Sequence, residues 1–109
     1  MKTRRLGNSD LELTTIGIGS FAMGGEGWKA SWGPQDEGEA IAAIQEGLNN
    51  GINWIDTAAV YGFGTSERLV AEAIKPLAEK PIIATKCGRI GNEADIWSEM
   101  KKAQIKGEC

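Results

Sequence analysis

The sequence predicts an α/β fold in which parallel strands alternate with helices along a chain of 109 residues. Two apolar stripes at helical spacing lie between three short apolar runs, which is typical of strands joined by right-handed crossovers. The 15 glycines cluster between these segments, which indicates tight turns or loops that approach another group closely. These observations predict one small domain over residues 1–109.

The composition argues against several classes of function. Charged residues make up 25% of the chain and the net charge is −3, so we expect no nucleic-acid partner. No apolar run approaches the ~18 residues of a membrane span, and the N-terminus lacks the apolar core of a signal peptide. The two cysteines do not make a disulfide framework. We therefore expect a cytoplasmic protein with no membrane partner.

The first third of the chain predicts a hairpin, a strand and a long loop. "TRRL" (3–6) and "LELT" (11–14) flank the turn-rich "GNSD" (7–10), which indicates a β-hairpin. A short strand follows over 15–20. Residues 21–35 show no period of 2 or 3.6 and contain four glycines, so we expect a loop there.

Two helices and two further strands follow. Asp36 can cap a helix that ends before Gly51, and "INWIDT" (52–57) reads as a strand. A second helix is predicted to open at Ser66 and to stop before Pro76. The third strand is "PIIATK" (81–86), "CGRIGNEAD" (87–95) is predicted to be loop, and a third helix begins within 97–109.

Two parallel-sheet architectures compete for this pattern. "GIGSFA" (17–22) matches the glycine signature of a dinucleotide-binding fold, which requires a helix to begin at the second glycine. Here the helix begins only near Asp36, so the signature fails its structural test. The alternative is a (β/α)8 barrel, in which functional residues gather at the carboxyl ends of the strands.

The barrel arrangement brings three chemical groups together. Because strand side chains alternate between faces, Asp56 and Lys86 would lie at the same end of neighbouring strands, roughly 5 Å apart in backbone spacing. Tyr61, the only tyrosine, would lie on the loop just above them. Taken singly, Asp56 could cap a turn, Lys86 could be a solvated charge and Tyr61 could be a packing residue.

With those residues in view, the chain resembles the N-terminal third of the aldo/keto reductase family. "GINWIDTAAVYGFGTSERLVAEAI" (51–74) resembles the stretch that carries the family's catalytic aspartate and tyrosine, and "IIATKCG" (82–88) resembles the strand that carries its lysine. "IGIGSFAMGG" (16–25) resembles the first strand and its loop, and the opening hairpin also matches. The resemblance implies the N-terminal part of a (β/α)8 TIM barrel, about three βα units, preceded by a β-hairpin.

The resemblance also implies an activity: NADPH-dependent reduction of aldehydes and ketones, small-molecule carbonyl substrates, to alcohols. Tyr61 would be the general acid, and Lys86 would lie beside it and favour proton release from the phenol. Asp56 would pair with Lys86 and help hold the nicotinamide ribose of the cofactor. Ser20 and Phe21 match positions that contact the nicotinamide half. No metal ligand is implied.

The chain departs from the family pattern in ways that keep a second hypothesis open. The family's catalytic histidine is missing, since the sequence contains no His, and three strands are far fewer than a barrel needs. We expect a truncated product, and the alternative function is a non-catalytic partial barrel that pairs with itself or with a partner chain. Self-association would cover the incomplete barrel's apolar interior.

Three smaller expectations complete the sequence reading. A Schiff-base aldolase using Lys86 is a weaker alternative, because an ammonium paired with Asp56 is a poor nucleophile. Trp28 and Trp32 lie where the family often builds an aromatic wall for substrate, with local loop packing as the equal alternative. Cys87 is predicted to be a buried structural thiol.

Overall fold

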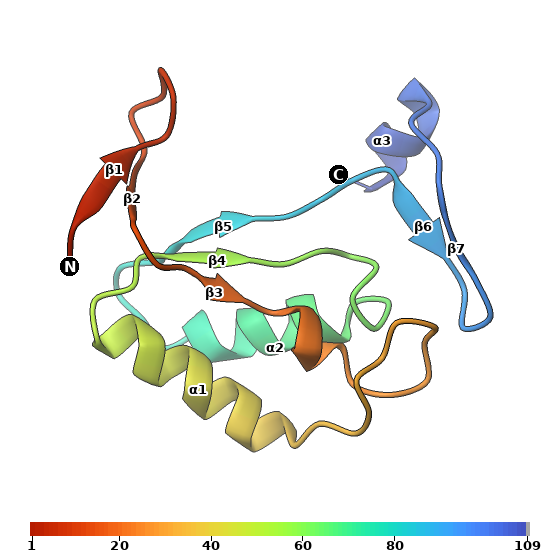
Figure 1. Cartoon of the computed structure of the whole chain (residues 1–109), viewed down its shortest axis with the longest axis horizontal. Coiled ribbons are helices and arrows are strands. Elements are labelled where there is room, and N and C mark those ends of the chain that lie inside the picture. The colour runs from red at the N-terminus through yellow and green to blue at the C-terminus, as the bar shows by residue number, and fades with distance from the viewer. Residues whose placement is uncertain (109) are drawn as a thin grey trace.

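A computed structural model describes residues 1–108 and shows a three-stranded parallel sheet flanked by two small hairpins (Figure 1). The central sheet has the order β3-β4-β5, with β3 at Ile18–Gly19, β4 at Trp54–Asp56 and β5 at Ile82–Ala84. Over the described part of the chain, no helix is long and apolar enough to cross a membrane. The parallel central sheet confirms the predicted α/β architecture.

The N-terminal hairpin lies at the amino ends of the central strands, as Figure 1 shows. Its strands β1 (Thr3–Arg5) and β2 (Glu12–Thr14) pair antiparallel, as the sequence predicts. Asn53, just before β4, holds this hairpin in place: its side-chain amide donates to the Glu12 carbonyl at 2.8 Å and its amide oxygen accepts from the Thr14 backbone N–H at 2.9 Å. These hydrogen bonds fix the hairpin next to the amino end of β4.

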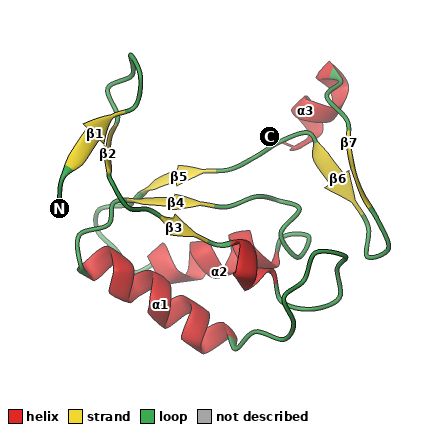
Figure 2. Ribbon diagram, in the orientation of Figure 1, coloured by secondary structure: helices red, strands yellow, loops and turns green. Residues whose placement is uncertain are grey.

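Both main helices pack on one face of the sheet (Figure 2). Helix α1 spans Glu37–Asn49, and the Asp36 carboxylate caps it by accepting from the Glu39 backbone N–H at 2.8 Å. Helix α2 spans Thr65–Ile74 and begins one residue before the predicted Ser66, because Gly64 in a left-handed conformation precedes it. The core between helices and sheet consists of fully or nearly buried aliphatic side chains: Ile44, Ile55, Val70 and Ala73.

The segment after the third strand differs from the prediction. Residues 87–95 were expected to be loop, but β6 (Arg89–Gly91) and β7 (Ile96–Ser98) form an antiparallel hairpin. The Asn92 side chain closes its turn by accepting from the backbone N–H groups of Ala94 and Asp95. Residues 87–95 contain Gly88, Gly91, Asn92 and Asp95, which are typical of loops, and they hold no apolar run, so the sequence pattern missed these strands.

Two short helical segments complete the fold. A 3₁₀ turn, η1, spans Phe21–Gly24 within the predicted loop, and helix α3 spans Lys102–Glu108 within the predicted third helix. The outer strands β3 and β5 each have one neighbour among the described residues, so both edges of this sheet are open there.

Candidate active site

The parallel register of the sheet brings Asp56 and Lys86 together at the carboxyl end of the strands. Asp56 is paired with Ala84 across β4 and β5, and Lys86 follows two residues later on the same side. The Lys86 Nζ donates to both Asp56 carboxylate oxygens, at 2.8 and 2.9 Å, and to the Thr57 carbonyl at 3.0 Å. The pair predicted from strand alternation is therefore present.

Tyr61 lies on the loop between β4 and α2 and faces the same lysine. The Lys86 Nζ lies 4.9 Å from the centre of the Tyr61 ring, a cation–π geometry. The ammonium thus lies beside the Tyr61 side chain. An acid, an amine and a phenol converge on one end of the sheet.

Two glycines explain how the Tyr61 loop comes so close to the loop after β3. Gly62 has a φ of +62°, and a Cβ added there would overlap the Gly24 carbonyl group. A Cβ added at Gly24 would lie 2.9 Å from the Gly62 backbone nitrogen. Only glycine at both positions allows this backbone contact, which places Phe21 against Tyr61.

Aromatic rings pack around Tyr61 from the long loop after β3. Phe21 makes edge-to-face contacts with Tyr61, Trp28 and Trp32, with ring centres 5.1, 5.3 and 5.6 Å apart. Trp28 is buried and its indole N–H donates to the Gly25 carbonyl at 2.9 Å, whereas Trp32 remains 79% exposed. Trp28 and Phe21 therefore form a fixed aromatic wall, and Trp32 stands at its outer edge.

Ser20 lies beneath the site rather than on its surface. It is fully buried, and its hydroxyl donates to the Asp56 carbonyl at 3.0 Å. The buried Ser66 hydroxyl, at the start of α2, lies 2.7 Å from the Ser20 hydroxyl and 3.3 Å from that of Thr57. These hydroxyl groups tie β3, β4 and α2 together directly under Asp56. A contact between Ser20 and a cofactor stays a prediction.

A small apolar cavity opens beside Tyr61 and Lys86. Its volume is about 250 Å³, and its walls are Phe21, Trp28, Ala30, Val60, Tyr61, Lys86, Arg89 and Ile96. Lys29 on the long loop and Asp95 on the β6–β7 turn form an ion pair at 2.7 Å that links two walls of this cavity. Segments far apart in the sequence thus enclose the space next to the phenol.

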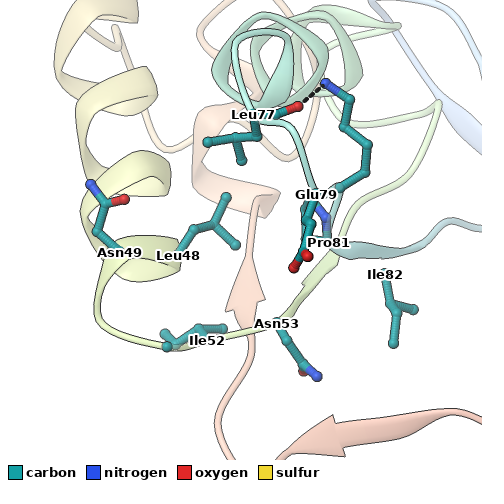
Figure 3. A pocket seen from close by; sticks show the side chains of 10 residues that line it. Leu48, Asn49, Ile52, Asn53, Leu77, Glu79, Pro81 and Ile82 are labelled. Atoms are coloured by element: carbon teal, nitrogen blue, oxygen red, sulfur yellow. Dashed lines mark hydrogen bonds between the residues drawn. The ribbon is translucent and has the colours of Figure 1, made fainter.

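A larger hollow of about 460 Å³ lies at the opposite, amino end of the strands (Figure 3). Its lining includes Leu48, Ile52, Asn53 and Leu77. Lys80 also lines it, but the Lys80 ammonium donates to the Ile74 carbonyl at the end of α2 and to the Leu77 carbonyl just after the helix, both at 2.8 Å. Its charged lining residues, Glu79 and Lys80, form no ion pair among the described residues, so the smaller cavity beside the Asp56–Lys86 pair is the better candidate site.

The surroundings of Lys86 keep it charged. Partial burial has the largest effect on the pKa of Lys86 and lowers it, but the Asp56 carboxylate and the neighbouring Tyr61 together outweigh this. The pKa of Lys86 consequently lies above its ordinary value, and the amine is an ammonium at neutral pH. This disfavours the aldolase alternative, which needs a neutral amine.

The sequence did not reveal two residues of the cavity wall, and the predicted burial of Cys87 is wrong. Arg89 and Ile96 line the cavity, yet they fall in or next to a segment predicted to be featureless loop, and no sequence signal marked them. Cys87 is exposed, not buried as predicted, because it follows the end of β5, where few side chains cover it. Across residues 1–108, no group of three potential metal ligands occurs.

Comparisons with known proteins agree with this geometry. The family model described as "Aldo/keto reductase family" matches residues 15–109. The chain is 34% identical over 110 residues to aldo-keto reductase YhdN of Bacillus subtilis (strain 168), covering 99% of this chain and 32% of that protein. It is 42% identical over 90 residues to the NADH-specific methylglyoxal reductase of Escherichia coli (strain K12), covering 81% of this chain and 27% of that protein.

A solved structure shows the same relation. The holo form of aldo-keto reductase AKR11C1 from Bacillus halodurans superimposes with a TM-score of 0.81 at 34% identity, covering 98% of this chain and 33% of that one. The chain thus spans about a third of the length of these relatives. Because the family model matches most of the sequence, the chain belongs to the aldo/keto reductase family.

Proposed function

We propose that the chain supplies the acid–base half of an NADPH-dependent reduction of aldehydes and ketones to alcohols. The single observation that carries this proposal is the convergence of Asp56, Lys86 and Tyr61 at the carboxyl ends of adjacent strands, beside an apolar cavity. Family membership supports an oxidoreductase, since the named relatives are reductases.

In the proposed reaction, Tyr61 donates its hydroxyl proton to the carbonyl oxygen of the substrate. Lys86 holds a positive charge next to the phenol ring, which favours the phenolate that remains after proton transfer. Asp56 fixes the position of that charge through two hydrogen bonds, at 2.8 and 2.9 Å. A nicotinamide coenzyme, when bound, supplies the hydride.

The residues present fit one end of such a coenzyme. Phe21 offers an apolar ring beside Tyr61, and the Asp56 side chain remains 39% exposed, so its carboxylate is accessible to a ribose hydroxyl. Ser20 would contribute through its position under Asp56, because its hydroxyl already bonds within the protein. We propose NADPH as the coenzyme, although one relative carries NADH in its name, so both need testing.

A chimera tests this proposal, because the chain spans about a third of its relatives. Residues 1–109 would replace the matching segment of the Bacillus subtilis relative, and oxidation of NADPH or NADH would be followed after an aldehyde is added. We expect the Tyr61→Phe chimera to lose about 10²–10⁴-fold in kcat while it retains coenzyme binding. Full activity of this variant would remove Tyr61 from the acid role.

The open sheet edges favour a second candidate function, a non-catalytic partial barrel that pairs with a copy of itself. The Ile82 N–H donates to the carbonyl just before β4 and the Ala84 carbonyl accepts from the N–H just after β4, so the Ile83 backbone groups face the unpaired edge. We expect self-association by light scattering, and Ile83→Pro should weaken it because proline removes an outward N–H. A chain that is monomeric at high concentration would contradict this candidate.

A further inference from the structure

Arg89 contributes a positive charge to the wall of the cavity that Tyr61 and Lys86 line, and the proposed reaction gives this charge no role. It lies at the start of β6, and its side chain donates to the Ser98 hydroxyl on β7 at 3.0 Å. This single hydrogen bond orients the guanidinium along the hairpin and leaves most of its N–H groups free. With the described residues, Arg89 forms no ion pair.

The other charges around the cavity have partners of opposite sign. Lys86 is held by Asp56, and Asp95, which lies near Arg89, is held by Lys29 at 2.7 Å. The Lys29 hydrogen bond is also the main reason that the pKa of Asp95 is lowered, with a smaller effect from the charge of Arg89. Arg89 is therefore the cation of the cavity wall that forms no ion pair with a carboxylate among the described residues.

The rest of the cavity wall is apolar, from Phe21, Trp28, Ala30, Val60 and Ile96. Such a surface accommodates the carbon skeleton of a ligand, while a planar guanidinium at one end is suited to bind a carboxylate through two parallel hydrogen bonds. Tyr61, on the same cavity, is the proposed partner of a carbonyl oxygen. The two groups supply polar contacts on the wall of one largely apolar space.

We propose that this cavity selects small carbonyl compounds that carry a carboxylate, with Arg89 as the residue that binds the acid group. This inference rests on the proposed function for its carbonyl end, and it adds the substrate class. Arg89 acts in specificity: it holds the far end of the ligand, while Tyr61 and Lys86 act at the carbonyl.

Binding to the 109-residue chain tests the proposal without coenzyme or turnover. The probes are 4-acetylbenzoate and its neutral methyl ester, two ketones that share a ring and differ in charge, titrated by calorimetry at low ionic strength. We expect the carboxylate to bind about fivefold more tightly than the ester, a modest factor because Arg89 is solvent-exposed. Arg89→Gln should remove this preference.

Arg68→Gln is the matched control, since it removes the same charge from α2, where Arg68 pairs with Glu37 and Glu72 instead of lining the cavity. This control should retain the preference for the carboxylate. Equal affinity for the two probes, no detectable binding of the carboxylate, or equal losses in the two arginine variants would overturn the proposal. Failure of the Tyr61→Phe chimera test would instead concern the reduction itself, so the two results remain distinguishable.

Discussion

The contact between Gly24 and Gly62 allows a quantitative test of how the site is assembled. An alanine at Gly62 would have to keep a φ of +62° and would overlap the Gly24 carbonyl. The left-handed conformation costs an alanine about 1–2 kcal/mol, and a forced backbone shift costs about 1–3 kcal/mol more. We therefore expect Gly62→Ala to lower the free energy of unfolding by about 3 kcal/mol.

Gly64 provides the control within the same loop. Its φ is +101°, but a Cβ there meets nothing within 4 Å, so Gly64→Ala should carry only the conformational cost of about 1–2 kcal/mol. Urea unfolding followed by tryptophan fluorescence and circular dichroism measures both variants. Equal losses in the two would show that the approach of the two loops does not depend on the missing side chain at Gly62.

Three further predictions follow from the core, the ion pair and the open barrel. Ile55→Ala should cost about 2–5 kcal/mol of stability in urea unfolding, because Ile55 is fully buried between the sheet and both helices, and Ile83→Ala at the exposed edge should cost far less. The raised pKa of Lys86 means that its pairing with Asp56 stabilises the fold fully below the ordinary lysine pKa of 10.5 and loses this effect as pH rises through the raised value. Stability measured across alkaline pH should therefore fall less in Asp56→Asn than in the parent; parallel curves would contradict the pairing. Titration of the isolated chain with NADPH should give no saturable change in tryptophan fluorescence, and a saturable curve would show that this third of the barrel binds coenzyme unaided.

The elements with long patterns or clear caps were predictable from the sequence. The Asp36 cap and the apolar stripe defined α1 because an amphipathic helix of 13 residues repeats its signal several times. The pairing of Asp56 with Lys86 was also predictable, because two parallel strands of known direction fix which ends meet. The catalytic and cofactor roles of Asp56, Tyr61, Lys86, Ser20 and Phe21 stay predictions.

The features that the sequence did not reveal depend on short or distant contacts. The β6–β7 hairpin begins in a segment with no apolar run, which looked like loop, so Arg89 could not be placed on a cavity wall from the sequence. Ser20 is predicted to contact the cofactor, but it is fully buried and its hydroxyl lies 2.7 Å from that of Ser66, 46 positions away. No local pattern encodes such a contact.

Asn53 lies just before β4 and Asp56 ends this strand, three residues and thus roughly 10 Å away, and the two residues serve opposite ends of the sheet. Asn53 anchors the N-terminal hairpin, whereas Asp56 faces the cavity. Substitutions at such separated positions combine almost additively. Substitutions that change how the N-terminal hairpin is anchored and substitutions that change the cavity can therefore accumulate independently during evolution, because a change at one end of the sheet has little effect on the other.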